Sequence, residues 1–215
     1  IMAERLIRAQ AVEFLADAPM RLKSGLISPV YVDNRKLFSH PEAWRDIVET
    51  MASRVEEYDL EFDIVAGVEA AGSMHAAALA YRLGLPAIMV RQKAKTYGNH
   101  SRIEGGDVKG MRVLLLEDHI STGLSCLDAI RALRGEGAQV TQVMSITNYA
   151  IPETQRLFKQ EGIDTYDVIA FEKVVRKAKE MGVIDDEHEK LVLEWLQTPW
   201  TWAAMHGVVA SAIEN

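Results

Sequence analysis

Two adjacent carboxylates follow an apolar run near the middle of the chain, and hydroxyl side chains follow the carboxylates. Residues 113–116 read Val-Leu-Leu-Leu, Glu117 and Asp118 come next, and residues 121–125 read Ser-Thr-Gly-Leu-Ser. A hydroxyl-rich turn that leads into a helix N-terminus offers N–H groups that suit a phosphate. The two acids can accept hydrogen bonds from sugar hydroxyls or face a hydrated magnesium ion. This stretch therefore predicts a phosphate site with a ribose site beside it.

A second interpretation of the same stretch stays open. In an ordinary strand–turn–helix connection, Asp118 and Ser121 would make only local turn hydrogen bonds. Two better-known phosphate motifs are excluded, since the chain contains neither GxxxxGK nor GxGxxG.

A basic segment over residues 91–102 is the second candidate. It carries four of the chain's 24 Lys and Arg residues together with His100, and glycines stand at 98, 105 and 106. A flexible cationic segment beside a phosphate site could close over a polyanion, stabilise a departing negative charge and exclude water. A solvated basic loop is the alternative.

Two further segments could contribute to the same site. Residues 22–35 place Lys23 among hydroxyls and a glycine, and Tyr31 follows on a short strand, so the segment could bind a planar anion. Its alternative is a turn and an edge strand without a ligand. In residues 65–72 a strand enters a small-residue turn before a helix, where free N–H groups could bind a second phosphate.

Apolar periodicity gives the elements that must position these segments. Strands are expected over residues 63–68, 86–90, 112–116 and 140–146, with a loop over 92–109. Helices are expected over residues 3–16, 41–57, 72–83, 125–134, 153–161, 171–181, 186–197 and 200–213. Alternating strands and helices predict an α/β fold with a parallel sheet.

We divide the single compact domain into three parts. They are an N-terminal hood over 1–40, an α/β core over 41–150 and a helical appendage over 151–215. Trp195, Trp200 and Trp202 should pack within the appendage.

The composition of the chain limits the classes of partner that it can bind. The 215 residues are 48% hydrophobic and carry a formal net charge of -7, which argues against nucleic acid. No apolar run approaches the roughly 18 residues of a membrane span, and residues 1–10 lack the apolar core of a signal peptide. The single cysteine, Cys126, permits no disulfide within the chain. We therefore expect a cytoplasmic protein without a membrane partner.

The four segments, taken in order, resemble the type I phosphoribosyltransferases over nearly the whole chain. The stretch from Val113 to Ser125 looks like that family's signature for phosphoribosyl pyrophosphate (PRPP). Within the family, Lys-Ser-Gly-Leu-Ile-Ser-Pro at 23–29 looks like the orotate-side motif of the orotate-using branch. Residues 91–98, with Ile-Glu-Gly at 103–105, look like its mobile catalytic loop.

The resemblance implies a type I fold and a reaction in which PRPP and orotate give orotidine 5′-monophosphate and pyrophosphate, as in the biosynthesis of UMP. It implies magnesium carried by PRPP, without a direct protein ligand, and a homodimer in which loop 91–106 acts across the interface. The implied catalytic residues are Lys95, Glu117 and Asp118. The implied PRPP-binding residues are Arg91, Gln92, Lys93, Lys95, Tyr97, Glu117, Asp118, His119, Ile120, Ser121, Thr122, Gly123, Leu124 and Ser125, with backbone contacts from 68–72. The implied orotate-binding residues are Lys23, Tyr31, Val32 and Ser121.

The chain departs from the family pattern at several positions. His119 stands where Val or Ile is usual, and residues 147–149 lack an arginine that some members place near orotate; Arg35 would compensate only if the fold brings it close. The remaining departures are Gln92, Tyr97 and Leu124. The simplest expectation for His119 itself is a partly buried ring without a catalytic role. A phosphoribosyltransferase for another base, and a non-catalytic PRPP-binding regulator, remain the alternatives.

Overall fold

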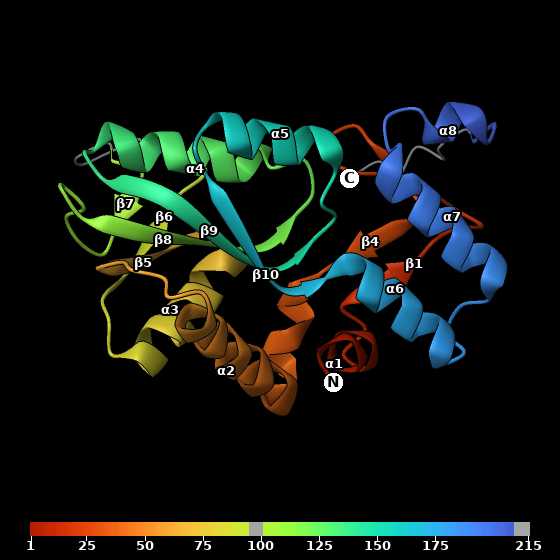
Figure 1. Cartoon of the computed structure of the whole chain (residues 1–215), viewed down its shortest axis with the longest axis horizontal. Coiled ribbons are helices and arrows are strands. Elements are labelled where there is room, and N and C mark those ends of the chain that lie inside the picture. Colours follow the sequence, from red (N-terminus) through yellow and green to blue (C-terminus); the bar gives the residue numbers. More distant parts are fainter. Residues whose placement is uncertain (95–100, 209–215) are drawn as a thin grey trace.

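Six of the strands in the computed structural model form one sheet, in the order β10-β9-β8-β5-β6-β7 (Figure 1). The structure describes residues 1–94 and 101–208. The elements are α1 (Met2–Arg8), β1 (Val12–Phe14), β2 (Met20–Arg21), β3 (Ile27–Ser28), β4 (Val30–Val32), the 3₁₀ helix η1 (Asn34–Ser39), α2 (Pro41–Glu57), β5 (Ile64–Val68), α3 (Ala71–Leu83), β6 (Ala87–Val90), β7 (Ile103–Glu104), β8 (Arg112–Ile120), α4 (Leu124–Gly135), β9 (Gln139–Asn148), α5 (Pro152–Gln160), β10 (Asp164–Ala170), α6 (Phe171–Glu180), α7 (Asp186–Gln197) and α8 (Trp202–Met205).

The large sheet is parallel apart from β7, which pairs antiparallel with β6. Helices α4 and α5 lie on one side of it and α2 and α3 on the other (Figure 1). Alternate residues of β8 enter different cores: Leu114 and Leu116 join the core that contains α2 and α3, whereas Val113 and Leu115 join the core that contains α4. Because both faces are covered, the strand reads as a continuous apolar run. The predicted α/β fold is confirmed.

Local signals explain several element boundaries. Pro41 occupies the first turn of α2, where the N–H that proline lacks would have no helical partner. Helix α3 ends at Gly84, which has a left-handed φ of 69°. Asp185 caps the N-terminus of α7, since its carboxylate accepts a hydrogen bond from the backbone N–H of His188 at 2.9 Å.

The prediction of one helix over residues 3–16 is wrong. Helix α1 ends at Arg8, Gln10 has a φ of 53°, and Val12 to Phe14 form a strand that pairs antiparallel with β4. The strand pairing overrides the helical spacing of the apolar residues, because β1 and β4 pair within residues 11–32 of the hood. A second antiparallel pair, β2 with β3, completes the hood.

The predictions for the C-terminal third are wrong in three places. Residues 164–170 form β10, an edge strand that pairs with β9, so residues 151–215 are not helical throughout. Within the described residues, the helix expected over 200–213 covers only Trp202–Met205, and residues 209–213 lie outside them. Trp195 and Trp202 are buried as expected, but Trp200 is 55% exposed.

Smaller differences concern the loop and the length of the strands. Residues 92–109, expected to form a loop, contain the short strand β7. Strands β8 and β9 continue to Ile120 and Asn148, beyond their predicted ends, because their pairing extends through His119 and Thr147. Within the described residues, no helix is both long and apolar enough to cross a bilayer.

Candidate functional site

Segments that are distant in the sequence surround one cavity of about 500 Å³. It lies where the hood meets the end of β8, the start of α4 and the root of the basic loop. The lining residues are Leu22, Lys23, Ser24, Tyr31, Val32, Gln92, Lys93, His119, Ser121, Thr122, Leu124, Ser125, Asp128 and Tyr149. Three of the four predicted segments therefore converge, as expected for the carboxyl ends of parallel strands. The fourth, residues 68–72, contributes no lining residue.

Glu117 and Asp118 lie inside the last part of β8. Glu117 is only 6% exposed, and its carboxylate accepts hydrogen bonds from the Ser125 hydroxyl at 3.0 Å and the Asp118 backbone N–H at 3.2 Å. Burial, and then the negative charge of Asp118, raise the pKa of Glu117 well above its usual value; burial also raises the pKa of Asp118. Two adjacent acids held in this way favour a partner that can donate hydrogen bonds to them.

Helix α3 begins close to this acid pair. A Cβ atom at Gly72 would lie 2.7 Å from the Leu116 carbonyl oxygen and 3.4 Å from Glu117 Oε1. A Cβ at Gly67 would lie 2.4 Å from the Ser73 Cα. A side chain at Gly72 would push α3 away from the end of β8, and one at Gly67 would push α3 away from β5. The small-residue turn over 65–72 therefore serves close packing beside the acids.

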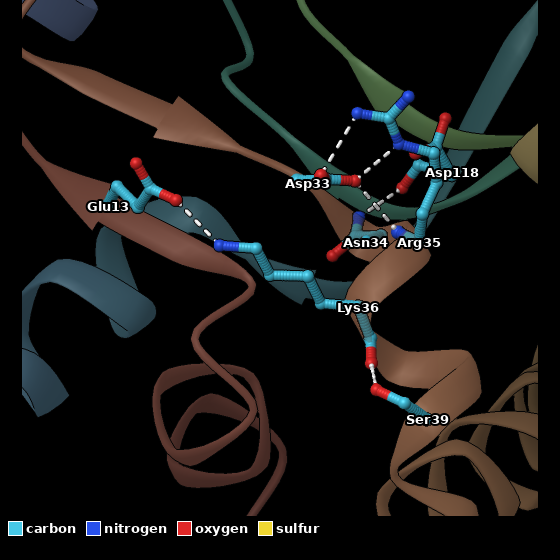
Figure 2. A network of polar contacts seen from close by, with 7 residues as sticks. All are labelled: Glu13, Asp33, Asn34, Arg35, Lys36, Ser39 and Asp118. Atoms are coloured by element: carbon cyan, nitrogen blue, oxygen red, sulfur yellow. Dashed lines mark hydrogen bonds and ion pairs between the residues drawn. The ribbon is translucent and has the colours of Figure 1, made fainter.

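Asn34 connects the hood to the acid pair (Figure 2). Its side-chain amide donates to the Asp118 backbone carbonyl at 2.7 Å and to Thr147 Oγ1 at 3.1 Å. Asn34 is fully buried, and this role was not predicted from the sequence. The neighbouring Arg35 donates two hydrogen bonds to Asp33, at 2.6 and 2.9 Å, and does not line the cavity. Arg35 is therefore not positioned to replace the arginine that residues 147–149 lack.

His119 lines the cavity as a neutral ring. Its Nδ1 lies 2.9 Å from Thr147 Oγ1. Thr147 accepts from the Asn34 amide, so its own hydroxyl proton is available for Nδ1, and the ring then carries its proton on Nε2. Burial lowers the pKa of His119 to about 3. Among the described residues Nε2 has no hydrogen-bond partner, and the ring packs edge-to-face on Tyr149 at a centroid distance of 4.2 Å.

The turn over residues 121–125, predicted to bind a phosphate, leads directly into the N-terminus of α4. Gly123 precedes α4 with a φ of 74°, and a Cβ there would lie 2.8 Å from Thr154 Cγ2. This position therefore requires glycine. Four residues of the turn line the cavity, namely Ser121, Thr122, Leu124 and Ser125, at the positive end of a 12-residue helix. Ile120 is 1% exposed and belongs to the core.

The root of the basic loop is tied to the sheet. Arg91 pairs with Glu104 at 2.8 Å, and the Gln92 backbone N–H donates to the Glu69 carboxylate at 3.1 Å. Arg102 donates to the Arg91 carbonyl at 2.7 Å and pairs with Asp128 at 2.6 Å. Gln92 and Lys93 line the cavity, as predicted. Lys95 and Tyr97 lie outside the described residues, so their predicted roles stay predictions.

Several members of the site were missed because they come from elements without a local signal. Asp128 and Tyr149 line the cavity, and Asn34 and Thr147 support it from behind. Ser24 also lines it and lies in the predicted 22–35 segment, although it was not named there as a ligand-binding residue. An Asn-Arg pair or a Thr-Asn-Tyr strand end is common in any α/β protein. Only the approach of residues 113 positions apart in the chain gives them a shared role.

We predict that replacing Glu117 by Gln stabilises the ligand-free protein at neutral pH. The native Glu117 pKa is raised, so above pH 4.5 the native carboxyl keeps a proton that the unfolded carboxyl has lost. The wild-type free energy of unfolding therefore falls as pH rises through that window. Glu117→Gln removes this cost, by about 1.4 kcal/mol per unit of pKa difference.

Urea unfolding at pH 4.5, 6 and 8 measures this effect. The advantage of the variant over wild type should grow with pH, whereas Glu172→Gln, at an exposed acid on α6, should give a difference near zero throughout. An advantage for Glu117→Gln that is constant from pH 4.5 to 8 would contradict the assigned burial.

Comparisons with known proteins agree with this site. Residues 33–181 match the family model of the phosphoribosyl transferase domain. Orotate phosphoribosyltransferase from Coxiella burnetii is 41% identical over 94% of this chain and 96% of its own. Among solved structures, Leishmania donovani UMP synthase superposes with a TM-score of 0.80 at 27% identity, covering 91% of this chain and 41% of that one.

Orotate phosphoribosyltransferase of Mycobacterium tuberculosis in complex with PRPP superposes with a TM-score of 0.60 at 26% identity, covering 80% of this chain and 98% of that one. The family model matches residues 33–181, and the identity to the Coxiella burnetii relative extends over 94% of this chain. The chain belongs to the orotate phosphoribosyltransferases, a branch of the phosphoribosyltransferase family.

Proposed function

We propose that this chain transfers the 5-phosphoribosyl group from PRPP to orotate, releasing pyrophosphate and forming orotidine 5′-monophosphate for UMP synthesis. The observation that carries the proposal is the cavity itself, where the 121–125 turn, the root of the basic loop and the hood meet. The acid pair does not line the cavity but adjoins it, because Asp118 precedes the lining residue His119 and Glu117 accepts a hydrogen bond from the lining residue Ser125. The PRPP complex of the Mycobacterium tuberculosis relative supports PRPP as the donor.

In this proposal the turn over residues 121–125 binds the 5-phosphate through its N–H groups and hydroxyls. Glu117 and Asp118 then accept hydrogen bonds from the two neighbouring ribose hydroxyls. A ribose carries its hydroxyls on adjacent carbons, which suits acids on adjacent residues. As positive charge develops at the anomeric carbon, as it does in glycoside cleavage, the acid pair stabilises it, because a neighbouring positive charge favours the ionised form of a carboxyl.

In this proposal the basic loop binds the pyrophosphate leaving group. Arg91, Lys93 and Lys95 would neutralise pyrophosphate as it departs, with Gln92 and Tyr97 completing the contacts. Lys95 is the catalytic group in this proposal, because a cation beside the breaking bond acts mainly in the transition state. Gln92 and Lys93 already line the cavity, which supports the loop's approach from this side.

Orotate would lie under the hood. Lys23 offers a cation to the orotate carboxylate, while Tyr31 and Val32 cover the ring and Ser121 contacts its edge. Nucleophilic attack by a ring nitrogen at the anomeric carbon forms the new C–N bond as the bond to pyrophosphate oxygen breaks. The cavity of about 500 Å³ has the size of a small-molecule site.

We further propose that magnesium enters bound to PRPP. Among the described residues, no group of three or more acidic, histidine or cysteine side chains could hold a metal ion. Glu117 and Asp118 alone make too small a donor set for a resident ion. The acid pair and the 68–72 turn suit contacts with magnesium-bound water. The ion would offset the charge of the pyrophosphate.

Two alternatives are distinguishable. Turnover with a purine or uracil but not with orotate would keep the class and change the base. PRPP binding without any turnover would indicate a regulator, although a sensor has no need for a basic loop with a catalytic lysine.

We also propose that the protein is cytoplasmic. The single cysteine, Cys126, is free and buried, which suits a reducing compartment such as the cytoplasm.

Replacing Lys95 by Ala tests the catalytic assignment. With PRPP, magnesium and orotate, wild type should consume orotate, measured by the loss of its ultraviolet absorbance, and omitting magnesium should stop turnover. Lys95→Ala should lower kcat by about 10²–10³-fold while PRPP affinity changes far less. Lys109→Ala, at an exposed lysine before β8, should match wild type. An equal loss in kcat and PRPP affinity would contradict the role of Lys95.

We also propose a homodimer in which loop 91–106 of one subunit completes its partner's site. A mixture of the inactive variants Lys95→Ala and Asp118→Asn should then recover about a quarter of wild-type activity, because half of the randomly formed dimers contain one intact site. Native mass spectrometry would establish that mixed dimers form. Mixed dimers without recovered activity would show that the loop acts within its own subunit.

A further inference from the structure

We propose that Trp195 is a positioning residue for the orotate side of the cavity, and that it acts together with Tyr149 by holding the hood segment Ile27 to Val32. This inference rests on the proposed function. No residue of α7, which carries Trp195, lines the cavity. Its effect must therefore pass through the hood, which supplies Tyr31 and Val32 to the lining.

Trp195 is fixed to the hood by a hydrogen bond. Its indole Nε1 donates to the Ile27 carbonyl oxygen at 2.8 Å, across 168 positions of sequence. The side chain is fully buried, so this bond is shielded from competing water. Ile27 belongs to β3, which ends two residues before β4 begins. The bond thus fixes the chain just before the strand that carries Tyr31.

Tyr149 makes the second attachment. Its hydroxyl donates to the Val30 carbonyl oxygen at 3.3 Å, and burial raises its pKa, so the hydroxyl keeps its proton. The Tyr149 ring packs edge-to-face on Trp195 at 4.9 Å and on His119 at 4.2 Å. Two aromatic contacts therefore link three rings: Trp195 on α7, Tyr149 at the strand end and His119 at the cavity wall.

The two carbonyl groups that accept these bonds flank Ser28, whose hydroxyl also donates to the Val30 carbonyl at 2.6 Å. The backbone from residue 27 to 30 is consequently attached at two points to groups outside the hood. A ring lying against Tyr31 requires that strand in one place, since a shift of about 1 Å in a binding group is enough to weaken binding strongly. Loss of either attachment should affect orotate more than PRPP, whose cradle lies on α4.

The test compares Trp195→Phe with Trp202→Phe. Both remove the same indole atoms from a buried side chain of the same core, but among the described residues the Trp202 Nε1 has no hydrogen-bond partner. Trp195→Phe should raise the KM for orotate about fivefold, the effect of one lost hydrogen bond, and leave the KM for PRPP within about twofold. Trp202→Phe should leave both constants within about twofold.

Equal effects of the two variants, or a parallel rise in both KM values for Trp195→Phe, would overturn the proposal. If circular dichroism shows that Trp195→Phe does not fold, Tyr149→Phe decides: it should raise the orotate KM alone, and an unchanged value would reject the role. An inactive wild type would refute the proposed function, whereas an active wild type with an unaffected Trp195→Phe would refute only this inference.

Discussion

The candidate site is organised around two adjacent carboxylates that are buried at the end of a central parallel strand. Glu117 is nearly inaccessible, and both acids have raised pKa values because burial disfavours their charge. The surrounding residues accommodate this cost. Ser125 donates to one carboxylate, Asn34 fixes the backbone of the other, and Gly72 lets α3 approach without steric conflict. Such an arrangement lowers the free energy of unfolding of the ligand-free protein. It also leaves buried acceptors that suit a ligand which donates hydrogen bonds.

The hood and the C-terminal helices complete the site on the side where the base would bind. The strand ends of an open sheet give a phosphate cradle and an acid pair, but they leave the base side uncovered. Residues 11–32 cover that side, and α6 and α7 lie beside β1 and β4 (Figure 1). Trp195 and Tyr149 connect the two parts through backbone carbonyls. The C-terminal helices therefore serve the geometry of the pocket without lining it. Among the described residues that follow Asp128, only Tyr149 lines the cavity.

Local features of the sequence were sufficient to predict the centre of the fold and three of the segments that line the cavity. The strand ending in Glu117 and Asp118, the Ser121–Ser125 turn and the helix after it all carry short-range signals. Asn34, Thr147 and Tyr149 carry none, because their roles arise from contacts between residues more than 80 positions apart. Strand β10 was missed because its partly exposed edge residues lack a continuous apolar run. Residues 10–14 show tertiary pairing prevailing over helical spacing.

The end of β8 and the turn after it would together bind one sugar phosphate, with adjacent acids on adjacent hydroxyls. A crystal structure of the protein with PRPP and magnesium would show this binding mode. We expect the 5-phosphate in the 121–125 turn and the two ribose hydroxyls on Glu117 and Asp118, with the pyrophosphate toward Lys93. A complex in which the 5-phosphate occupies another site, or in which the acids contact no ribose hydroxyl, would contradict it.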